Sequence, residues 1–409
     1  MKLFLSAAAS QNINAELQIT GSKSESNRLL LLSALFPNIK IENLSNSDDT
    51  RLMKKGLSAK EGPVDIHHAG TAMRFLTAYF ASRDGMELVI TGSQRMKERP
   101  IKILVDALTD LGARIEYLEK DGYPPLKIRG KKLTKPHTTL PANISSQYIS
   151  ALLLIAPSLE NGLKLRLEGK ITSAPYIEMS CELLNRLGIR TSFDGNIIVV
   201  DKANKMPDQV LTVESDWSSA SYFYSFVALA APGSSIRLSS YHGKSLQGDS
   251  VLSKIYEAFG VSTTFKDHSL ILKKESHKID QHFSYNLVNA PDLAQTIAVS
   301  CFGLGIGCDL TGLHTLKIKE TDRLEALNTE LTKLGASIET TDERLILSPG
   351  GVPKADVTIA TYHDHRMAMA FAPLAMRTSM FIEDAGVVSK SYPDFWEDVK
   401  SLGIELNRT

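Results

Sequence analysis

Two short stretches of this chain carry the residue types that bind anions and move protons. Lys319-Glu320-Thr321-Asp322-Arg323 sets cations and a carboxylate around the first turn of a leucine-striped segment, so these side chains can point together. Asp292 follows Ala290-Pro291 at the start of another apolar segment. An aspartate at a helix start is often only an N-cap, so from its position Asp292 can be a cap or an acid/base group.

Similar clusters of small, hydroxyl and basic residues occur elsewhere. Residues 21–28, GSKSESNR, place Lys23 and Arg28 five positions apart with hydroxyls between them, so both cations can flank one anion. The segment lacks the G-x-x-x-x-G-K-[ST] spacing of a P-loop, and an N-cap with solvated charges fits it too. Ser145-Ser146-Gln147 offers neutral groups that suit hydroxyls, whereas the basic stretch 95–100, RMKERP, also fits a solvated turn.

The clusters open helix-length segments that are apolar on nearly every side. Successive starts lie 46, 75, 71, 76 and 72 residues apart, at Ser24, Gly70, Ser145, Asp216, Asp292 and Asp364. A helix that is apolar all round is buried, and its first N–H groups then need partners. The chain therefore has six potential anion sites at buried helix starts.

A second series of amphipathic segments keeps step with the first. These segments end in Leu-Gly or Phe-Gly at Gly112, Gly188, Gly260, Gly335 and Gly403, and four of the five are followed by a predicted hairpin. In 323–347, for example, leucines stripe a helix, Gly335 ends it, and two short apolar runs flank residues 341–343. The predicted repeat consists of a strand, a buried helix, a second strand, an amphipathic helix and a hairpin, and it occurs six times. Because 409 residues exceed what one hydrophobic core usually supports, we expect two domains of three repeats each.

The first two helix starts, Ser24 and Gly70, are only 46 residues apart, which is too short for a complete repeat. Between Gly56 and Val64 there is no room for the hairpin that ends the other repeats. We therefore expect one repeat, shortened near 56–64, to lack its terminal hairpin.

The composition argues against several classes of protein. Lys plus Arg and Asp plus Glu number 46 each, which disfavours a general polyanion binder, so no nucleic acid partner is expected. No run approaches the ~18 apolar residues of a membrane span, and residues 1–5 fit a first strand better than a signal peptide. His363 and His365 lack a third ligand spaced for zinc. Three cysteines in apolar surroundings indicate reduced, buried thiols in a cytoplasmic protein.

A series of motifs along essentially the whole chain resembles the enolpyruvylshikimate-phosphate synthase family. In family order they are GSKSESNR at 21–28, AGTAMR at 69–74, RMKERPI at 95–101, SSQ at 145–147, SAPY at 173–176, SDWSSASYF at 215–223, QGD at 247–249, KIKETDR at 317–323, YHDHRMAM at 362–369 and KSYPDF at 390–395. KETDR, DHRMAM and RMKERP together make the resemblance specific.

The resemblance implies a transferase that moves the enolpyruvyl (carboxyvinyl) group of phosphoenolpyruvate to the 5-hydroxyl of shikimate 3-phosphate and releases phosphate. It implies addition and elimination through a tetrahedral intermediate, on the shikimate pathway to chorismate and the aromatic amino acids. No metal or organic cofactor is implied. A monomer is expected, with glyphosate as an inhibitor at the phosphoenolpyruvate position and with domain closure on the first substrate.

The implied fold is an α/β fold of six βαβαββ repeats, three in each of two domains, whose buried helices point at the interdomain cleft. By the same resemblance the chain crosses between the domains near Gly21 and Asp216. The first domain would therefore comprise 1–20 and 217–409, and the second 21–216.

By resemblance, two overlapping sets of residues bind the substrates. The set expected at phosphoenolpyruvate is Lys23, Gly70, Arg95, Gln147, Arg323, Arg366 and Lys390. The set expected at shikimate 3-phosphate is Lys23, Ser24, Arg28, Ser145, Ser146, Gln147, Ser173, Tyr176, Asp292 and Lys319. Asp292 is assigned to the 5-hydroxyl proton and Glu320 to the methyl carbon, with Lys23 assisting at the phosphate or leaving oxygen. These groups would titrate together, so the division among them stays open.

Three positions depart from the family pattern: His67-His68 replaces Gly-Asn, Phe75 replaces Pro, and Thr315 stands where Asn is common, so Thr315 receives no substrate contact. One alternative function is the related enolpyruvyl transferase acting on UDP-N-acetylglucosamine, which typically uses a loop cysteine that the stretch around Arg95 lacks. The other is a non-catalytic phosphate- or RNA-binding relative built from similar repeats, which the neutral net charge disfavours.

Overall fold

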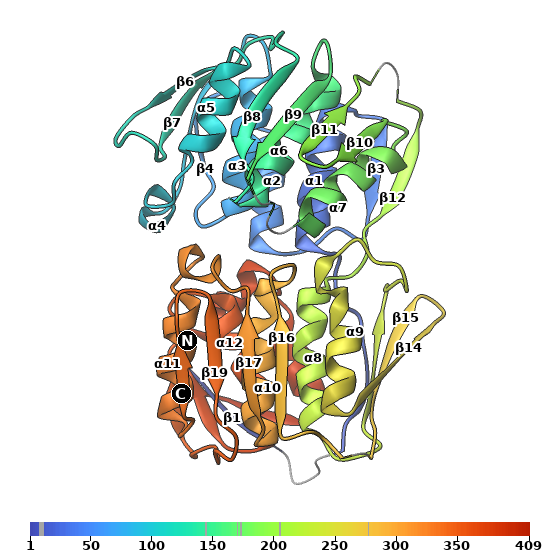
Figure 1. Ribbon diagram of the computed structural model, residues 1–409, viewed down its shortest axis with the longest axis vertical. Coiled ribbons are helices and arrows are strands. Elements are labelled where there is room, and N and C mark those ends of the chain that lie inside the picture. Colours follow the sequence, from blue (N-terminus) through green and yellow to red (C-terminus); the bar gives the residue numbers. More distant parts are fainter. Residues whose placement is uncertain (8–11, 144, 170, 172–173, 204–205, 277) are drawn as a thin grey trace. The chain divides into compact units, whose positions relative to one another are not determined.

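The computed structural model describes residues 1–7, 12–143, 145–169, 171, 174–203, 206–276 and 278–409. Within these residues the chain forms two compact units (Figure 1). Unit 1 comprises Met1–Thr20 and Glu214–Thr409, and unit 2 comprises Gly21–Val213. The chain therefore begins in unit 1, builds all of unit 2, and then returns to complete unit 1.

The second repeat, in unit 2, has the full βαβαββ plan. Its elements are β4 (Pro63–Asp65), α3 (Gly70–Ala81), β5 (Glu87–Thr91), the short α4 (Gln94–Lys97), α5 (Lys102–Asp110), β6 (Arg114–Tyr117) and β7 (Leu126–Arg129). The sheet order is β4-β5-β7-β6. The first pair is parallel and the others are antiparallel, as expected when a helix crosses between the first two strands and a hairpin joins the last two.

The third repeat follows the same plan, with sheet order β10-β11-β9-β8. Its elements are β8 (His137–Pro141), α6 (Ser146–Ile155), the turn η1 (Ala156–Ser158), β9 (Leu163–Glu168), α7 (Ala174–Arg186), β10 (Thr191–Asp194) and β11 (Ile197–Val200).

The first repeat lacks its hairpin, which confirms the expectation from the short first interval. It contains α1 (Lys23–Leu35), β3 (Ile39–Glu42) and α2 (Asp48–Leu57), and β4 of the next repeat already begins at Pro63. In the described part of the chain, its sheet has two strands, because β12 (Gln209–Thr212) pairs in parallel with β3. A strand from the far end of unit 2 thus replaces the missing opening strand.

In unit 1 the fourth and fifth repeats form sheets of order β14-β15-β13-β2 and β16-β17-β19-β18. The fourth repeat contains β2 (Asn14–Leu17), α8 (Trp217–Leu229), β13 (Ser235–Ser239), η2 (Gly248–Val251), α9 (Leu252–Ile255), η3 (Tyr256–Phe259), β14 (Val261–Lys266) and β15 (Ser269–Lys274). The fifth contains β16 (His282–Asn286), η4 (Pro291–Leu293), α10 (Ala294–Leu304), β17 (Gly307–Thr311), η5 (Leu316–Ile318), α11 (Arg323–Lys333), β18 (Ile338–Thr340) and β19 (Arg344–Leu347). The predicted helix and hairpin of 323–347 are therefore confirmed.

The sixth repeat is completed by the N-terminal strand of the chain. It contains β20 (Val357–Ile359), α12 (His365–Phe371), η6 (Ala372–Met376), β21 (Met380–Ile382), η7 (Ala385–Lys390), α13 (Phe395–Ser401), β22 (Ile404–Arg408) and β1 (Leu3–Ala7). β1 pairs antiparallel with both β21 and β22. The first residues therefore form a strand, as the sequence predicts.

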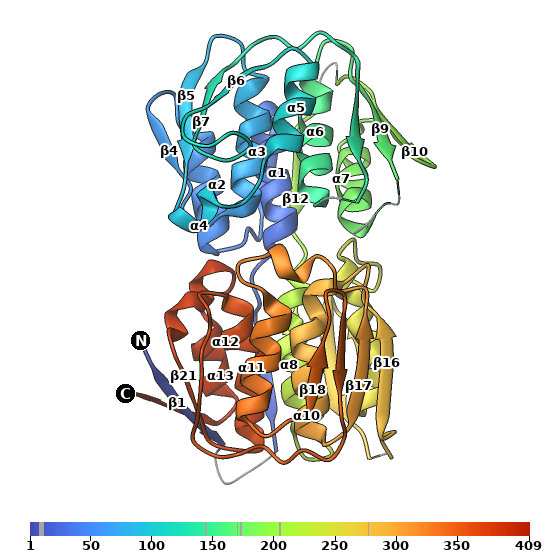
Figure 2. The same cartoon turned by 60° about the vertical axis from the view of Figure 1, so that its left-hand side comes forward.

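Apolar helices lie in the middle of each unit, surrounded by the sheets. In unit 1, α8, α10 and α12 lie together, and in unit 2, α1, α3 and α6 do (Figure 2). In α8 every residue except Ser218 is buried. A helix enclosed on all sides needs apolar residues all round, whereas α5, α7 and α11 bury one face and are amphipathic. The two hydrophobic patterns of the sequence therefore separate the inner helices from the outer ones.

Every helix in the described ranges falls short of the length and apolar character that crossing a bilayer requires. Cys181, Cys301 and Cys308 are buried and free. Burial raises the pKa of the Cys181 thiol to about 11, so this group is protonated at neutral pH.

Candidate active site

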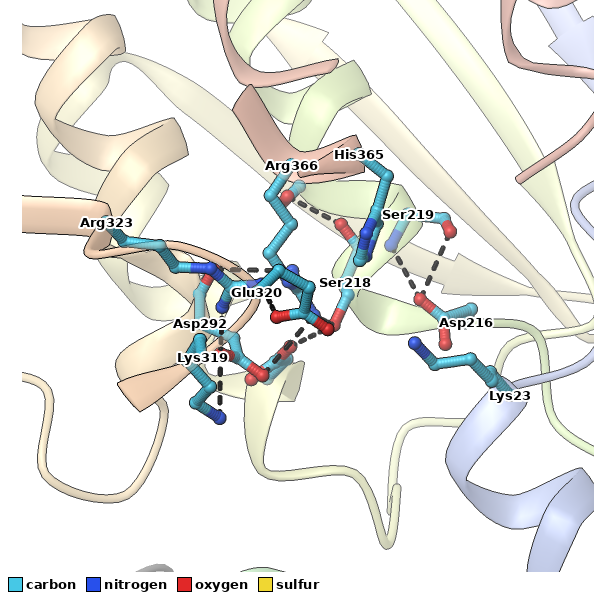
Figure 3. Close-up of polar contacts among 12 residues, drawn as sticks. Lys23, Asp216, Ser218, Ser219, Asp292, Lys319, Glu320, Arg323, His365 and Arg366 are labelled. Carbon is cyan, nitrogen blue, oxygen red and sulfur yellow. Dashed lines mark hydrogen bonds and ion pairs between the residues drawn. The ribbon is translucent and has the colours of Figure 1, made fainter. Parts of the chain in front are cut away.

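The guanidinium of Arg323 joins three carboxylates in unit 1 (Figure 3). Its Nη1 donates to Oδ1 of Asp292 over 2.7 Å, its Nη2 to Oε2 of Glu320 over 2.9 Å, and its Nε to Oδ2 of Asp364 over 2.7 Å. The Arg323 side chain is only 2% exposed. Burial works against the cation, but the three carboxylates outweigh it and raise the pKa of Arg323 further. Arg323 is therefore a permanent cation that holds Asp292 and Glu320 together.

Arg323 takes this position because it is the first residue of α11. Asp322 caps the helix by accepting a hydrogen bond from the Leu324 N–H over 3.1 Å. Leu324, Leu327 and Leu331 are buried and anchor one face of α11 in the core of unit 1. The predicted leucine stripe thus fixes the arginine at the helix start.

Asp292 is the middle residue of the turn η4, which directly precedes α10. Lys319 Nζ is 3.3 Å from its Oδ1, and Arg366 Nη2 is 3.4 Å from its Oδ2. Burial favours the neutral acid, but Lys319, Arg366 and Arg323 outweigh it and hold the pKa of Asp292 well below its usual range. Asp292 is therefore a carboxylate with cations on both of its oxygens.

Glu320 binds Arg323 through one oxygen and Lys390 through the other. Lys390 Nζ donates to Oε1 of Glu320 over 2.8 Å. Lys390 is buried at the end of η7, so the sixth repeat supplies this cation to a carboxylate of the fifth. The structure thus brings together the residues that the sequence singled out at 319–323, Asp292, Arg366 and Lys390.

Two carboxylates without a predicted role complete this network. Asp364 is fully buried, binds Arg323, and caps α12 by accepting from the Arg366 N–H over 2.9 Å. Asp249 accepts a hydrogen bond from Ser218 Oγ, which in turn accepts from Arg366 Nη2 over 3.1 Å. Burial raises the pKa of Asp249 to about 6, against the attraction of Arg366. Both aspartates stand in quoted motifs, DHRMAM and QGD, but a capping aspartate and a network aspartate look alike in a sequence.

In unit 2, Arg28 lies inside the protein at 2% exposure. Its Nε donates to Ser180 Oγ over 2.8 Å and its Nη1 to the Ser24 carbonyl over 2.8 Å. Its Nη2 donates to Ser150 Oγ and to the Tyr176 carbonyl, over 3.0 and 3.2 Å. Burial lowers the pKa of Arg28 to about 10. Much of the hydrogen-bonding capacity of this arginine is therefore used to hold the first turn of α1 to α7.

Gly70 begins α3, and an arginine that the sequence analysis did not single out lies against it. A methyl group on Gly70 would stand 2.6 Å from Arg99 Nη1, so the Arg99 guanidinium occupies the space beside this glycine. The start of α3 has no side-chain cap, and an uncapped start beside a cation suits an anion. Arg95, the residue expected here, is exposed and lies 3.3 Å from Glu98.

The start of α6 contacts the start of α3. Gln147 Nε2 donates to Thr71 Oγ1 over 3.2 Å, which places the Gln147 amide close to Gly70. Ser145 caps α6 by accepting from the Gln147 N–H over 3.4 Å, and Ser146 is buried. These neutral groups therefore lie at the same edge of unit 2 as Gly70.

Lys23 and Ser24 lie in the first turn of α1, and Tyr176 lies in the first turn of α7. Lys23 Nζ is 3.7 Å from Asp49 Oδ2, and Lys23 and Ser24 are half-buried. Tyr176 is half-buried too, while Ser173 lies outside the described residues. In the part of the chain that is described, no group of three or more His, Cys, Asp or Glu side chains is placed to hold a metal ion.

At the start of α8, one of the six potential anion sites, side chains of the protein occupy two of the N–H donors. The Ser219 N–H at the start of α8 donates to Asp216 over 2.8 Å, and the Trp217 N–H donates to Gln247 Oε1 over 2.9 Å. The protein's own side chains therefore satisfy these donors. Gln247 follows Trp217 by thirty residues, so local sequence gives no sign of this cap.

Sequence comparison connects this site with known proteins. The family model described as EPSP synthase (3-phosphoshikimate 1-carboxyvinyltransferase) matches residues 7–62 and 55–399. The 3-phosphoshikimate 1-carboxyvinyltransferase of Bacteroides fragilis strain YCH46 is 45% identical over 410 residues, which cover 98% of each chain. The enzyme of that name from Colwellia psychrerythraea strain 34H is 36% identical over 422 residues, covering 95% of this chain and 97% of the relative.

Solved structures share the fold. EPSP synthase from Acinetobacter baumannii gives a TM-score of 0.81 at 21% identity, over 100% of both chains. The enolpyruvyl transferase NikO from Streptomyces tendae gives 0.76 at 14% identity, over 100% of this chain and 99% of that one. At such low identity, the solved structures show only that the fold is shared. The family model and the 45% identical relative cover nearly the whole chain, and they show the family. The chain belongs to the family of EPSP synthases, the 3-phosphoshikimate 1-carboxyvinyltransferases.

Proposed function

We propose that this chain transfers the carboxyvinyl group of phosphoenolpyruvate to the 5-hydroxyl of shikimate 3-phosphate and releases phosphate, as a step of the shikimate pathway to chorismate and the aromatic amino acids. Membership of the family supports the overall reaction. The observation that carries the chemistry is that one buried guanidinium, that of Arg323, holds both Asp292 and Glu320. The reaction needs two such acid/base groups.

The cations of the site match the charge of the substrates. A phosphate group carries about −1.5 to −2 near neutral pH, so two phosphates and two carboxylates bring roughly −5 to −6. In unit 1, Lys319 and Arg366 form ion pairs with Asp292, and Lys390 forms one with Glu320. We infer that these ion pairs keep the cations in position until phosphate or carboxylate groups of the substrates compete for them.

This exchange of partners explains how Asp292 can act as a base. A carboxylate whose pKa is held well below its usual range is a weak base, and the cations around Asp292 hold it there. When substrate anions draw charge from Lys319 and Arg366, the pKa of Asp292 rises. Asp292 is then able to accept the proton of the 5-hydroxyl, while Arg323 keeps the carboxylate in place.

Glu320 is assigned to the proton at carbon 3 of the enolpyruvyl group. It gives this proton when the tetrahedral intermediate forms and takes one back when phosphate leaves, and Lys23 assists at the phosphate or leaving oxygen. Lys390 and Arg323 each bind one oxygen of Glu320. Release of Lys390 to the substrate would remove a cation that favours the ionised carboxylate of Glu320, and this step requires the protonated form.

Phosphoenolpyruvate is assigned to Lys23, Gly70, Gln147, Arg323, Arg366 and Lys390, with Arg99 in the place that the sequence analysis gave to Arg95. Arg99 lies against Gly70 at the uncapped start of α3, whereas Arg95 is exposed. Glyphosate, which resembles a phosphorylated anion of this size, is assigned to the same position.

Shikimate 3-phosphate is assigned to Lys23, Ser24, Arg28, Ser145, Ser146, Gln147, Ser173, Tyr176, Asp292 and Lys319. Arg28 supports this site from inside, because it holds the carbonyls of Ser24 and Tyr176. We further propose a cytoplasmic monomer in which the two compact units are the two domains of the family.

The experiment is a phosphate-release assay with phosphoenolpyruvate and one of two acceptors, shikimate 3-phosphate or UDP-N-acetylglucosamine. We expect release only with shikimate 3-phosphate. Release only with the nucleotide sugar would assign the chain to the related transferase, and no release with either would favour a non-catalytic binding protein.

A further inference from the structure

The segment from Ala360 to Asp364 joins β20 to α12 and has an unusual backbone. Tyr362 has φ +54° and His363 has φ +55°, so two consecutive residues with side chains are left-handed. In this conformation the β-carbon crowds the following carbonyl oxygen, and residues other than glycine rarely adopt it. The segment therefore needs contacts from outside to keep its shape.

Glu330, three residues before the end of α11, supplies such contacts. Its Oε1 accepts a hydrogen bond from Tyr362 Oη over 2.6 Å, and its Oε2 accepts from the Ala360 N–H over 3.2 Å. The Glu330 side chain is fully buried, and Lys333 Nζ lies 2.8 Å from Oε1. Burial and the hydrogen bond to Glu330 raise the pKa of Tyr362 to about 12, so the phenol remains a donor across the neutral range.

The same face of α11 also carries Arg323. Residues seven positions apart lie two turns from each other on one side of a helix. Arg323 binds Asp364 at one end of the segment, and Glu330 binds Ala360 and Tyr362 at the other. One helix face therefore holds both ends of the strained segment.

We propose that Glu330 and Tyr362 are positioning residues for the reaction, which hold the left-handed segment and thereby set Asp364. Asp364 contacts both arginines of the site: it accepts from Arg323 Nε and from the Arg366 N–H, which it caps at the start of α12. A shift of this carboxylate would displace the guanidinium that holds Asp292 and Glu320. The proposal rests on the proposed function for the identity of the substrates.

The first test is Tyr362→Phe, which removes the hydroxyl and keeps the ring. We expect the KM for phosphoenolpyruvate to rise and kcat to fall, each by roughly 5- to 10-fold, as for one lost hydrogen bond, with the KM for shikimate 3-phosphate less affected. The matched control is Thr340→Val, which removes a 3.1 Å hydrogen bond from Asn328 of the same helix to another partner. This control should leave both KM values unchanged.

The second test is rescue by glycine. Glycine adopts the left-handed conformation without steric conflict, so His363→Gly should restore most of the activity lost in Tyr362→Phe. His363 is exposed, and its ring contacts Asp384 at 3.0 Å on the surface. His363→Gly alone should therefore stay within about twofold of wild type.

A purely structural role for Tyr362 predicts different results. It would lower the stability of Tyr362→Phe without a change in kinetics, and glycine at 363 would restore nothing; either result would overturn the proposal. Amide hydrogen exchange of residues 358–366 in the same variants needs no substrate. Faster exchange in Tyr362→Phe and its reversal by His363→Gly are expected even if wild type proves inactive, and unchanged exchange in Tyr362→Phe would refute the proposal separately from the proposed function.

Discussion

Arg323 donates one hydrogen bond to Asp292 and another to Glu320, so the two carboxylates assigned to the proton transfers share one buried cation. The same guanidinium is bound to Asp364, which caps α12. Arg323 thereby connects the fifth and sixth repeats at the point where the chemistry is assigned.

Arg323→Lys keeps the charge but loses the planar fork that binds three carboxylates in separate directions. We expect the free energy of unfolding to fall by about 3–5 kcal/mol, because buried carboxylates lose their partner, and kcat to fall by at least ~100-fold. Urea unfolding and steady-state rates would measure both effects. The control is Arg344→Lys on the exposed pair with Asp309, where we expect a loss within about 1 kcal/mol and normal kcat. Wild-type kcat in Arg323→Lys would refute the role of Arg323.

Arg99→Ala and Arg95→Ala form a matched pair within one basic stretch. Arg99 lies beside Gly70, whereas Arg95 is exposed next to Glu98. We expect Arg99→Ala to raise the KM for phosphoenolpyruvate at least ~10-fold, as for a lost hydrogen bond to a charged group, and Arg95→Ala to change it less than about twofold. A larger increase in this KM for Arg95→Ala than for Arg99→Ala would show that Arg95, and not Arg99, binds phosphoenolpyruvate.

Gly70→Ala should weaken the binding of both phosphoenolpyruvate and glyphosate with little loss of stability. The new methyl group would stand 2.6 Å from Arg99 Nη1, the end of a flexible side chain, so the guanidinium and not the backbone must move. We expect the inhibition constant for glyphosate and the KM for phosphoenolpyruvate to rise, and the unfolding free energy to change by less than about 1 kcal/mol. Gly243→Ala, where the methyl group meets only ordinary contacts, is the control. Unchanged inhibition in Gly70→Ala would exclude this steric effect.

Because the pKa of Asp249 is raised, we expect the free energy of unfolding to depend on pH. Its pKa is about 6 in the folded protein and near the ordinary 3.8 in the unfolded chain, so the folded state holds the extra proton between these values. The stability that Asp249 contributes is present at low pH and is lost as the pH rises through about 6. Asp249→Asn cannot ionise, so its stability relative to wild type should increase from pH 4 to pH 7.5 by up to roughly 3 kcal/mol.

Denaturant unfolding at a series of pH values would measure this difference, with Asp309→Asn as a control of opposite sign. The hydrogen bond from Arg344 lowers the pKa of Asp309, so the stability that Asp309 contributes is lost as the pH falls through this lowered pKa. Asp309→Asn should therefore become less stable relative to wild type as the pH rises from acid to neutral. If the difference in unfolding free energy between Asp249→Asn and wild type did not change with pH, the raised pKa of Asp249 would be excluded.

The fold could be predicted from the sequence because burial dictates residue type directly. A helix enclosed by three sheets must be apolar all round, so α8 and α10 are recognisable without knowledge of their neighbours. The missing hairpin was predictable from chain length alone, since α2 ends at Leu57 and β4 begins at Pro63. The replacement of the opening strand by β12, about 170 residues after β3, depends on tertiary pairing that no local pattern encodes.

The site was predictable where a motif fixes the backbone. Lys319, Glu320 and Arg323 surround a helix start that the leucines of α11 anchor, so their meeting follows from local sequence. Arg95 and Arg99 stand in one basic stretch, and which of them faces Gly70 depends on how α4 packs beside α3. The hydrogen bond between Glu330 and Tyr362 joins residues 32 positions apart and leaves no mark on either local pattern.

The proposed reaction protonates carbon 3 of phosphoenolpyruvate before phosphate leaves. Because the intermediate methyl group receives a solvent proton and then loses one of its three hydrogens, the product formed in D₂O should carry deuterium in its vinyl group. Mass spectrometry of the product from phosphoenolpyruvate and shikimate 3-phosphate in D₂O measures this directly. Deuterium in the vinyl carbon at complete conversion is the expected result, and product without deuterium would contradict the mechanism.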